Sequence, residues 1–324
     1  MRAQSCRRSS LRPRVAAAFA PAAITNFFSV GTGRVQDSDF SRVGATGGGY
    51  ILSKGVVSVA TVGDGGGRGL HIIVDGDPDY SARTTRRALE HMLEAHAPVR
   101  NSVLVEQKMD VPVGCGFGAS AASAVSACYA LAAALGLDDS KAEIAYHAHV
   151  ADILEKTGLG TVSVSFDAIG AGAIVTPGGP GVSKFLNVSY PDEIRIVTAS
   201  LGPYRKSNAI SNPEMVSKIQ RLGDASLHRF VESQTLETLA SEGERFSSAL
   251  GLMTPQLAEL AASAKRAGAT HASQNMIGYA IHALAPKDEA PKVAKALRAS
   301  RLGPRVGVFR IGKKRAGVLR GSAG

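Results

Sequence analysis

The chain has 324 residues, of which 44% are hydrophobic and 36 are glycine. This length and composition indicate a globular protein with room for one large or two ordinary domains and a substantial core. No apolar stretch approaches the roughly 20 residues that a membrane span requires, so we expect no membrane association. The apolar run from Ala124 to Leu137 is too short and contains Ser126, which favours a core helix.

The net charge of +10 is concentrated at the two ends of the chain. Residues 1–14 contain five arginines and no acid, and residues 311–324 contain four cations and no acid. The part between them is therefore nearly neutral, and we expect both termini to be frayed basic extensions. A nucleic-acid-binding surface needs clustered charge on the folded part, so no specific nucleic-acid partner is expected.

The three cysteines, Cys6, Cys115 and Cys128, are odd in number and lack metal-ligand spacing. They indicate reduced thiols in a cytoplasmic protein. Residues 1–14 have no continuous apolar region, which argues against a secretory signal. Their Arg and Ser content leaves an organellar presequence open, but a disordered extension is the simpler interpretation.

Sequence patterns predict the secondary-structure elements in chain order. Short apolar or alternating runs predict strands at residues 15–19, 50–52, 56–62, 71–74, 102–108, 162–166, 172–175, 184–188, 194–199 and 305–310. Helical periodicity and capping signals predict helices at residues 77–97, 119–135, 141–156, 274–284 and 291–299, and throughout 212–265. We expect Pro21 to end the first strand, residues 44–49 to form a glycine loop, and residues 63–69 to form a hairpin turn. This order predicts an α+β protein with a boundary near Tyr190.

One stretch is typical of an anion site: Pro112-Val113-Gly114-Cys115-Gly116-Phe117-Gly118-Ala119-Ser120, here called the glycine loop. Three glycines at every second position permit positive φ angles and close approach of a ligand to the backbone. The strong helix formers after it predict a helix whose N-terminal N–H groups point at the ligand, most often a phosphate. The alternative is a tight turn before a core helix. A Walker A loop and a Rossmann fingerprint both fit poorly, because no Lys follows Gly118 and Asp110 to Pro112 separate the loop from the preceding strand.

The motifs resemble those of the GHMP kinase superfamily and, within it, the archaeal pantoate kinases. The glycine loop resembles the superfamily's Pro-x-x-x-Gly-Leu-Gly-Ser-Ser. Further similarities follow in order along the chain, at residues 21–28, 44–49, 148–152, 157–161, 177–181 and 201–203. The resemblance implies a two-domain α+β fold, with a ribosomal-protein-S5-like N-terminal domain and a ferredoxin-like C-terminal domain. The domains would span residues 15–190 and 191–310, between a disordered extension at 1–14 and a basic tail at 311–324.

The resemblance also implies a function. This is ATP-dependent phosphorylation of the hydroxyl of (R)-pantoate to 4-phosphopantoate, in coenzyme A synthesis, with Mg²⁺. ATP would bind to Pro112, Gly114, Gly116, Phe117, Gly118, Ala119 and Ser120. Ser120 and Asp152 would bind the metal, and both are expected to be catalytic together with the residue at position 161. Thr25, His149, Arg205 and Lys206 would contact the substrate.

The acceptor half departs from the family pattern. Thr161 stands where the family has its catalytic Asp, and Ala23 stands where it has a His. No clear general base remains, and Asp167 is the next carboxylate along the chain. The acceptor could therefore be another small hydroxy acid or alcohol, such as mevalonate or homoserine, or the chain could be a catalytically weakened nucleotide-binding or RNA-associated homologue. Whether it forms a homodimer is left open.

Structural interpretations of these residues also stay open at this stage. Asp152 could lie on the solvent face of a helix, and His149 could be a core histidine with satisfied hydrogen bonds. Arg205 and Lys206 could be a solvated pair of loop cations.

Overall fold

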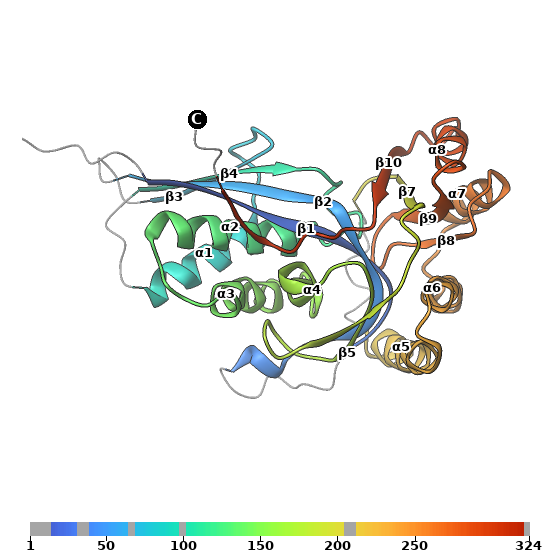
Figure 1. Ribbon diagram of the computed structural model, residues 1–324, viewed down its shortest axis with the longest axis horizontal. Coiled ribbons are helices and arrows are strands. Elements are labelled where there is room, and N and C mark those ends of the chain that lie inside the picture. The colour runs from blue at the N-terminus through green and yellow to red at the C-terminus, as the bar shows by residue number, and fades with distance from the viewer. Residues whose placement is uncertain (1–13, 31–38, 64–68, 97–101, 204–211, 321–324) are drawn as a thin grey trace, which may run out of the picture.

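A computed structural model gives the fold, and it describes residues 14–30, 39–63, 69–96, 102–203 and 212–320. They form two β-sheets with helices packed around them, which confirms the predicted α+β class (Figure 1). The strands are β1 (Arg14–Ser29), β2 (Thr46–Gly63), β3 (Gly69–Val74), β4 (Ser102–Met109), β5 (Ala171–Thr176), β6 (Lys184–Val188), β7 (Ile194–Ser200), β8 (His271–Gln274), β9 (Ala280–Pro286), β10 (Arg305–Arg310) and β11 (Gly317–Leu319). The helices are α1 (Arg83–Ala95), α2 (Ala119–Leu135), α3 (Lys141–Leu154), α4 (Thr161–Asp167), α5 (Pro213–Ser233), α6 (Leu236–Leu250), α7 (Pro255–Arg266) and α8 (Ala290–Arg298), with a 3-10 helix η1 (Phe40–Arg42).

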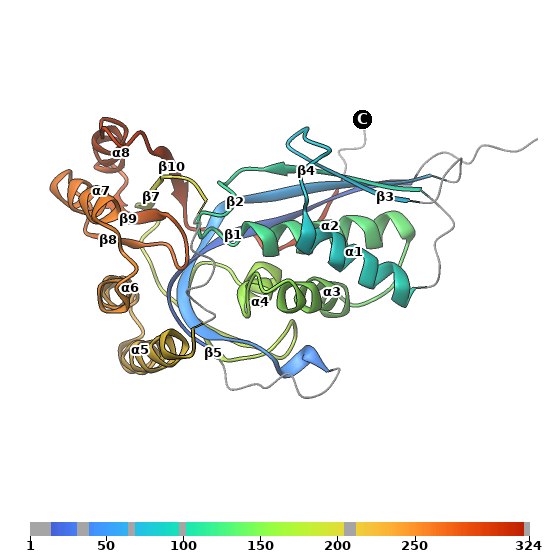
Figure 2. The same ribbon diagram turned by 180° about the vertical axis from the view of Figure 1, so that it is seen from behind.

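The first sheet has the strand order β11-β1-β2-β4-β3, and β5 and β6 extend it from β2. Its long antiparallel strands β1 and β2 curve around helices α1 to α4, which lie on one face in both views (Figures 1 and 2). Helix α2 packs against β1, β2 and the other three helices, and 14 of its 17 residues are buried. Its many alanines allow this, because small side chains let neighbours approach the helix closely from every direction. The start of α2 is thereby held in place against the neighbouring elements.

The second sheet has the order β10-β7-β9-β8 and packs against α7 and α8. Helices α5 and α6 pack against β1, and α6 also packs against β8, so they connect the two sheets. Strand β7, the first strand after Tyr190, belongs to the second sheet. The division of the chain into two domains at that point stays a prediction.

Two expectations about the first strands are wrong. Strand β1 continues through Pro21 to Ser29, because a register shift between Pro21 and Ala23 accommodates the proline without breaking the pairing to β2. Residues 46–49, expected in a loop, begin β2. A Cβ at Gly49 would lie 1.9 Å from the Ile24 carbonyl oxygen, so these glycines serve close approach of two strands.

Three further elements differ from the sequence-based expectation. No hairpin joins β2 to β3, because β4 lies between them and runs parallel to β3; residues 64–68 of the expected turn lie outside the described part. Residues 162–166, expected as a strand, lie in α4. Residues 280–284, expected in a helix, lie in the buried strand β9. Short apolar or alternating runs do not distinguish a strand from a buried helix by periodicity.

The C-terminal residues 311–320 are packed, contrary to the expected frayed tail. Strand β11 pairs with β1, and the cations before it have partners on the body of the protein. Lys313 lies 2.5 Å from Asp192, Arg315 lies 2.9 Å from Asp167, and Lys314 lies over the Phe19 ring. At the other end, Arg14 already belongs to β1, whereas residues 1–13 lie outside the described part.

Within the described residues, no helix combines the length and the apolar character needed to cross a membrane.

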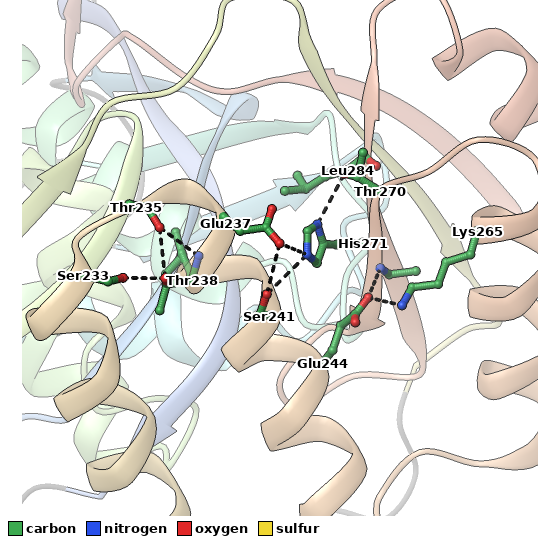
Figure 3. Close-up of polar contacts among 12 residues, drawn as sticks. Ser233, Thr235, Glu237, Thr238, Ser241, Glu244, Lys265, Thr270, His271 and Leu284 are labelled. Atoms are coloured by element: carbon green, nitrogen blue, oxygen red, sulfur yellow. Dashed lines mark hydrogen bonds and ion pairs between the residues drawn. The ribbon is translucent and has the colours of Figure 1, made fainter.

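Polar contacts tie α6 to the second sheet (Figure 3). Glu244 accepts one hydrogen bond from the Ala272 backbone N–H and pairs with Lys265 at 2.6 Å, while Glu237 lies 3.1 Å from Nε2 of His271. These contacts fix the helix against the edge strand β8.

Candidate active site

The glycine loop connects β4 to α2 and has the backbone that its composition predicts. Gly114, Gly116 and Gly118 all have positive φ angles, of 73°, 76° and 60°. Gly118 is the N-cap residue of α2, and no side chain caps the first turn. The N–H groups at this helix start are therefore available to an anion, and the helix dipole favours negative charge there.

The loop is held from two sides by hydrogen bonds to its carbonyl groups. The Ala23 N–H in β1 donates to the Phe117 carbonyl at 3.1 Å. The Asn275 side chain, next to the end of β8, donates to the Cys115 carbonyl at 3.3 Å. Two different elements thus fix the loop before any ligand binds.

The side chains assigned to nucleotide binding differ in exposure. Phe117 and Ala119 are buried, and the Phe117 ring lies 6.2 Å from the ring of Phe309. Pro112 and Ser120 are half-buried. Ser120 lies in the first turn of α2, so its hydroxyl is the polar side chain of the loop placed closest to the helix start. Phe117 and Ala119 could contribute only their backbone groups to a ligand.

Asp152 in α3 is almost completely buried, with 1% exposure, and is not on a solvent face. Thr157 donates a hydrogen bond to its Oδ1 at 2.6 Å, and Thr84 Oγ1 lies 3.1 Å from the Thr157 hydroxyl. Its second oxygen, Oδ2, has no hydrogen-bond partner among the described residues. Burial raises the pKa of Asp152 to about 6, although the Thr157 hydrogen bond opposes this shift.

An unpartnered buried carboxylate oxygen is costly unless something binds it. In the described part of the chain, no group of three or more His, Cys, Asp or Glu residues is arranged to hold a metal. Mg²⁺ does not need such a group, because it typically takes one or two protein oxygens and fills its other positions with phosphate oxygens and water. Asp152 Oδ2 and the Ser120 hydroxyl are hard oxygen donors on the directly packed helices α3 and α2, so these residues fit Mg²⁺.

Thr161 lies beside the glycine loop. It is the first residue of α4, and a Cβ at Gly118 would lie 2.5 Å from its Cγ2 atom. The segment from Thr157 to Thr161 therefore links Asp152 to the start of α2. Asp167, at the other end of α4, pairs with Arg315 and is not placed as a substitute base.

His149 is 1% exposed, and its Nε2 atom donates to the Phe40 carbonyl at 3.0 Å. A Cβ at Gly179 would lie 2.8 Å from its ring, so the loop at residues 177–181 covers it. Burial lowers the pKa of His149, which favours the neutral ring. These contacts are those of a core histidine, and its contact with substrate stays a prediction.

The other substrate residues are placed as follows. Thr25 lies in β1, and its carbonyl accepts a hydrogen bond from the Met276 N–H at 3.0 Å. Arg205 and Lys206 lie outside the described residues.

His271 lies close to one carboxylate and one hydroxyl, the residue types of a hydrolytic triad. Figure 3 shows Glu237 and Ser241 on the same side of His271, and both approach its Nε2 atom, at 3.1 and 3.4 Å. A Ser-His-acid triad needs the hydroxyl at one ring nitrogen and the acid at the other. Glu237 is also mostly exposed, so this cluster is a surface contact.

Comparisons with known proteins relate the chain to a family of kinases. Residues 83–167 match the model for the GHMP kinases N terminal domain. A solved structure described as a phosphotransferase related to CoA biosynthesis pathway is 27% identical and superposes with a TM-score of 0.82, covering 95% of this chain and 100% of the other.

The chain thus contains a GHMP kinase N-terminal domain.

The named relatives of the chain fall into two groups. Pantoate kinase from Thermococcus kodakarensis is 29% identical, with 86% of this chain and 91% of the relative covered. Mevalonate kinase from Pyrococcus furiosus is 28% identical, with 66% of this chain and 68% of the relative covered.

Sequence reasoning did not single out Thr84, Thr157, Asn275 or His282 as functional. Thr157 lies in a stretch that the family resemblance covered, so its hydroxyl could have been noticed as a partner for Asp152. Asn275 and His282 carry no local signal, because the fold brings Asn275 to Cys115 of the glycine loop from 160 residues away along the chain, and His282 contacts Asn275.

Proposed function

We propose that this GHMP kinase transfers the γ-phosphoryl group of ATP to a hydroxyl of pantoate, giving 4-phosphopantoate. The observation that carries the proposal is the glycine loop, with three glycines at positive φ opening onto an uncapped helix start. The relatives named pantoate kinase and the similarity to a phosphotransferase related to CoA biosynthesis support the choice of acceptor.

The phosphates of ATP would lie against the backbone of the loop and the first turn of α2. Backbone N–H groups there donate to phosphate oxygens, and the helix dipole stabilises their negative charge. Phosphoryl transfer requires mainly positioning and charge neutralisation, so a rigid loop supplies much of the catalysis.

We assign Ser120 and Asp152 as the protein ligands of Mg²⁺. The ion, when bound, neutralises charge on the transferring phosphoryl oxygens. Asp152 has to be ionised for this role, and its free Oδ2 atom is the oxygen available to the ion. Thr157 keeps the carboxylate in one orientation through its bond to Oδ1.

In the transfer, the acceptor hydroxyl oxygen forms a bond to the γ-phosphorus, and the bond from this phosphorus to the bridging oxygen of ADP breaks. The hydroxyl proton passes to water or to an oxygen of the transferred group, because Thr161 has no carboxylate to accept it. A loose transition state tolerates such a weak base. We assign Thr25 and His149 to contacts with the acceptor, and Arg205 and Lys206 to its carboxylate, since cations pair well with a carboxylate.

A second candidate acceptor is mevalonate, also a small hydroxy acid, because mevalonate kinases are among the relatives. The same loop and the same carboxylate would serve either reaction. The two candidates differ only in the pocket that receives the hydroxy acid.

ADP release with ATP and Mg²⁺ tests the proposal when pantoate, mevalonate and homoserine are compared at equal concentrations. We expect the highest kcat/KM with pantoate and formation of a phosphomonoester on its hydroxyl. Preference for mevalonate would select the second candidate. ATP binding without turnover of any hydroxy acid would contradict both.

A further inference from the structure

A chain of buried hydrogen bonds runs from the second sheet to the glycine loop. Ser273 Oγ lies 3.1 Å from His282 Nε2, His282 Nδ1 lies 2.9 Å from Asn275 Oδ1, and Asn275 Nδ2 lies 3.3 Å from the Cys115 carbonyl oxygen. Ser273, Asn275 and His282 are each at most 2% exposed. Water therefore has little access to replace any link.

The donor and acceptor roles in this series of hydrogen bonds follow from its last acceptor, the Cys115 carbonyl. The Cys115 carbonyl can only accept, so Asn275 presents its amide NH₂ to it and turns Oδ1 toward His282. His282 then carries its proton on Nδ1, and Nε2 accepts from the Ser273 hydroxyl. Burial lowers the pKa of His282 to about 3, which keeps the ring neutral and compatible with this single arrangement.

Gly278 and Asn275 also pack closely against one peptide unit of the loop. A Cβ at Gly278 would lie 2.2, 2.3 and 2.5 Å from the C and O atoms of Cys115 and the N atom of Gly116. These nearly equal distances place Gly278 over the face of the Cys115–Gly116 peptide. A Cβ at Gly116 would lie 2.8 Å from the Asn275 Cβ, so this side chain packs directly beside the loop.

A trans peptide is planar, and its C=O and N–H bonds point in opposite directions. Fixing the Cys115 carbonyl toward Asn275 therefore turns the Gly116 N–H to the opposite side. The bond from Ala23 to the Phe117 carbonyl acts in the same way on the Gly118 N–H. Backbone donors held in advance bind an anion without the cost of ordering the loop.

We propose that His282, in its Nδ1–H tautomer, is a positioning residue for nucleotide binding, acting through Asn275 to aim the Gly116 N–H at the phosphates of ATP. The proposal rests on the proposed function, because it requires the glycine loop to be the nucleotide site. His282 does not itself touch the nucleotide.

Three variants test this series of hydrogen bonds one bond at a time. Asn275→Asp keeps the shape but removes the donor to Cys115, and we expect the ATP KM to rise about 10-fold or more, since an unpaired buried group of this kind costs one to two factors of ten. His282→Leu removes the donor to Asn275 and should raise the ATP KM by several-fold. His282→Asn places an amide N–H close to the position of Nδ1 and should restore most of the affinity.

Asn26→Asp is the matched control. Asn26 is also fully buried, and its amide bonds to Tyr50 and Leu239 rather than to the loop. A positioning role raises the ATP KM, and the Kd of an ATP analogue, in Asn275→Asp but not in Asn26→Asp, and leaves the KM of the acceptor within about twofold. A merely structural role would lower the unfolding temperature and shift both KM values together, and would contradict the proposal.

A readout without turnover is the ring nitrogen spectrum of His282 in the ¹⁵N-labelled protein. We expect a neutral Nδ1–H tautomer from pH 5 to 8 in the wild type and in Ser273→Ala, a milder change that should fold if the others do not. The opposite tautomer would overturn the proposal. If the wild type binds nucleotide and all variants bind equally well, this inference fails alone; if the wild type binds none, it fails together with the proposed function.

Discussion

The two sides of Gly118 offer different chemistry to a substrate. On one side, the glycine loop, the start of α2 and Asp152 provide backbone donors and a carboxylate oxygen without a partner. On the other side, Thr161 packs against the loop without a carboxylate, and the Nε2 atom of His149 is already bonded to the Phe40 backbone. The first side, here called the phosphate side, thus offers groups that bind charged phosphates and a metal ion. The other side, here called the acceptor side, lacks a carboxylate at position 161.

This difference between the two sides indicates which substitutions would change the activity most. Phosphate binding depends on backbone geometry, and a fold that keeps this geometry keeps its affinity for nucleotide. Acceptor choice depends on a few side chains, which can change without disturbing the loop. Variants on the phosphate side should therefore cost more activity than variants on the acceptor side.

The largest effect is expected for Asp152→Asn. The amide cannot supply the negative charge that we assign to Mg²⁺ binding, so kcat should fall by about 100-fold to 1000-fold, equal to a few kcal/mol of transition-state stabilisation. Steady-state kinetics with a Mg²⁺ titration measures this. Stabilisation by Mg²⁺ and an ATP analogue in thermal unfolding should also disappear. A variant with wild-type Mg²⁺ dependence would remove Asp152 from the metal site.

The second prediction concerns how the free energy of unfolding depends on pH in the absence of Mg²⁺. Burial raises the pKa of Asp152 from 3.8 to about 6, so the folded state binds the proton more tightly than the unfolded state. The resulting contribution of Asp152 to the free energy of unfolding is fully present below its unfolded pKa and is lost as the pH rises through about 6. The shift of about two pKa units corresponds to roughly 3 kcal/mol.

Denaturant unfolding at pH 4 to 8 measures this stability change. Asp152→Asn should remove this part of the pH dependence and be more stable than the wild type at pH 8. Added Mg²⁺ and nucleotide should reduce the difference, because they bind the ionised carboxylate. Equal pH dependence of wild type and variant would show that Asp152 titrates near its ordinary value.

Ser120→Ala is expected to be next in size. It removes one hydroxyl from the first turn of α2, and kcat/KM for ATP should fall by about 10-fold to 100-fold. Ser123→Ala is the matched control, because Ser123 lies one turn later in the same helix and its hydroxyl contacts Met109. Equal losses in both variants would contradict a phosphate or metal role for Ser120.

The sequence predicts the phosphate side better than the acceptor side, for a physical reason. Alternating glycines before an Ala-rich helix specify a local backbone, and local backbone follows from local sequence. The positive φ angles at Gly114, Gly116 and Gly118 and the bounds of α2 confirm that part. The burial of Asp152 depends on how α3 packs, which no local pattern states.

The incorrect element assignments have a similar origin. Residues 280–284 and 162–166 are short runs whose hydrophobic pattern fits a strand or a helix, and tertiary packing decides between them. The glycines at residues 47–49 read as a loop, but they let β1 and β2 approach closely. Sequence also cannot show that Asn275 reaches the glycine loop, because its partner Cys115 is 160 residues away along the chain.

The smallest expected effect is a gain on the acceptor side, from Thr161→Asp. A carboxylate at the first position of α4 is favoured by the helix dipole and lies beside Gly118, where it could accept the proton of the acceptor hydroxyl. Because the transition state is loose, we expect kcat to rise only about 10-fold, with the ATP KM unchanged. Thr161→Asn, of similar size but uncharged, should show no gain. If the gain comes from a base, the pH profile of kcat in Thr161→Asp should acquire an acid limb that is absent from Thr161→Asn. Equal rates for the two variants would mean that the missing carboxylate does not limit this enzyme, and that the proton leaves without help from position 161.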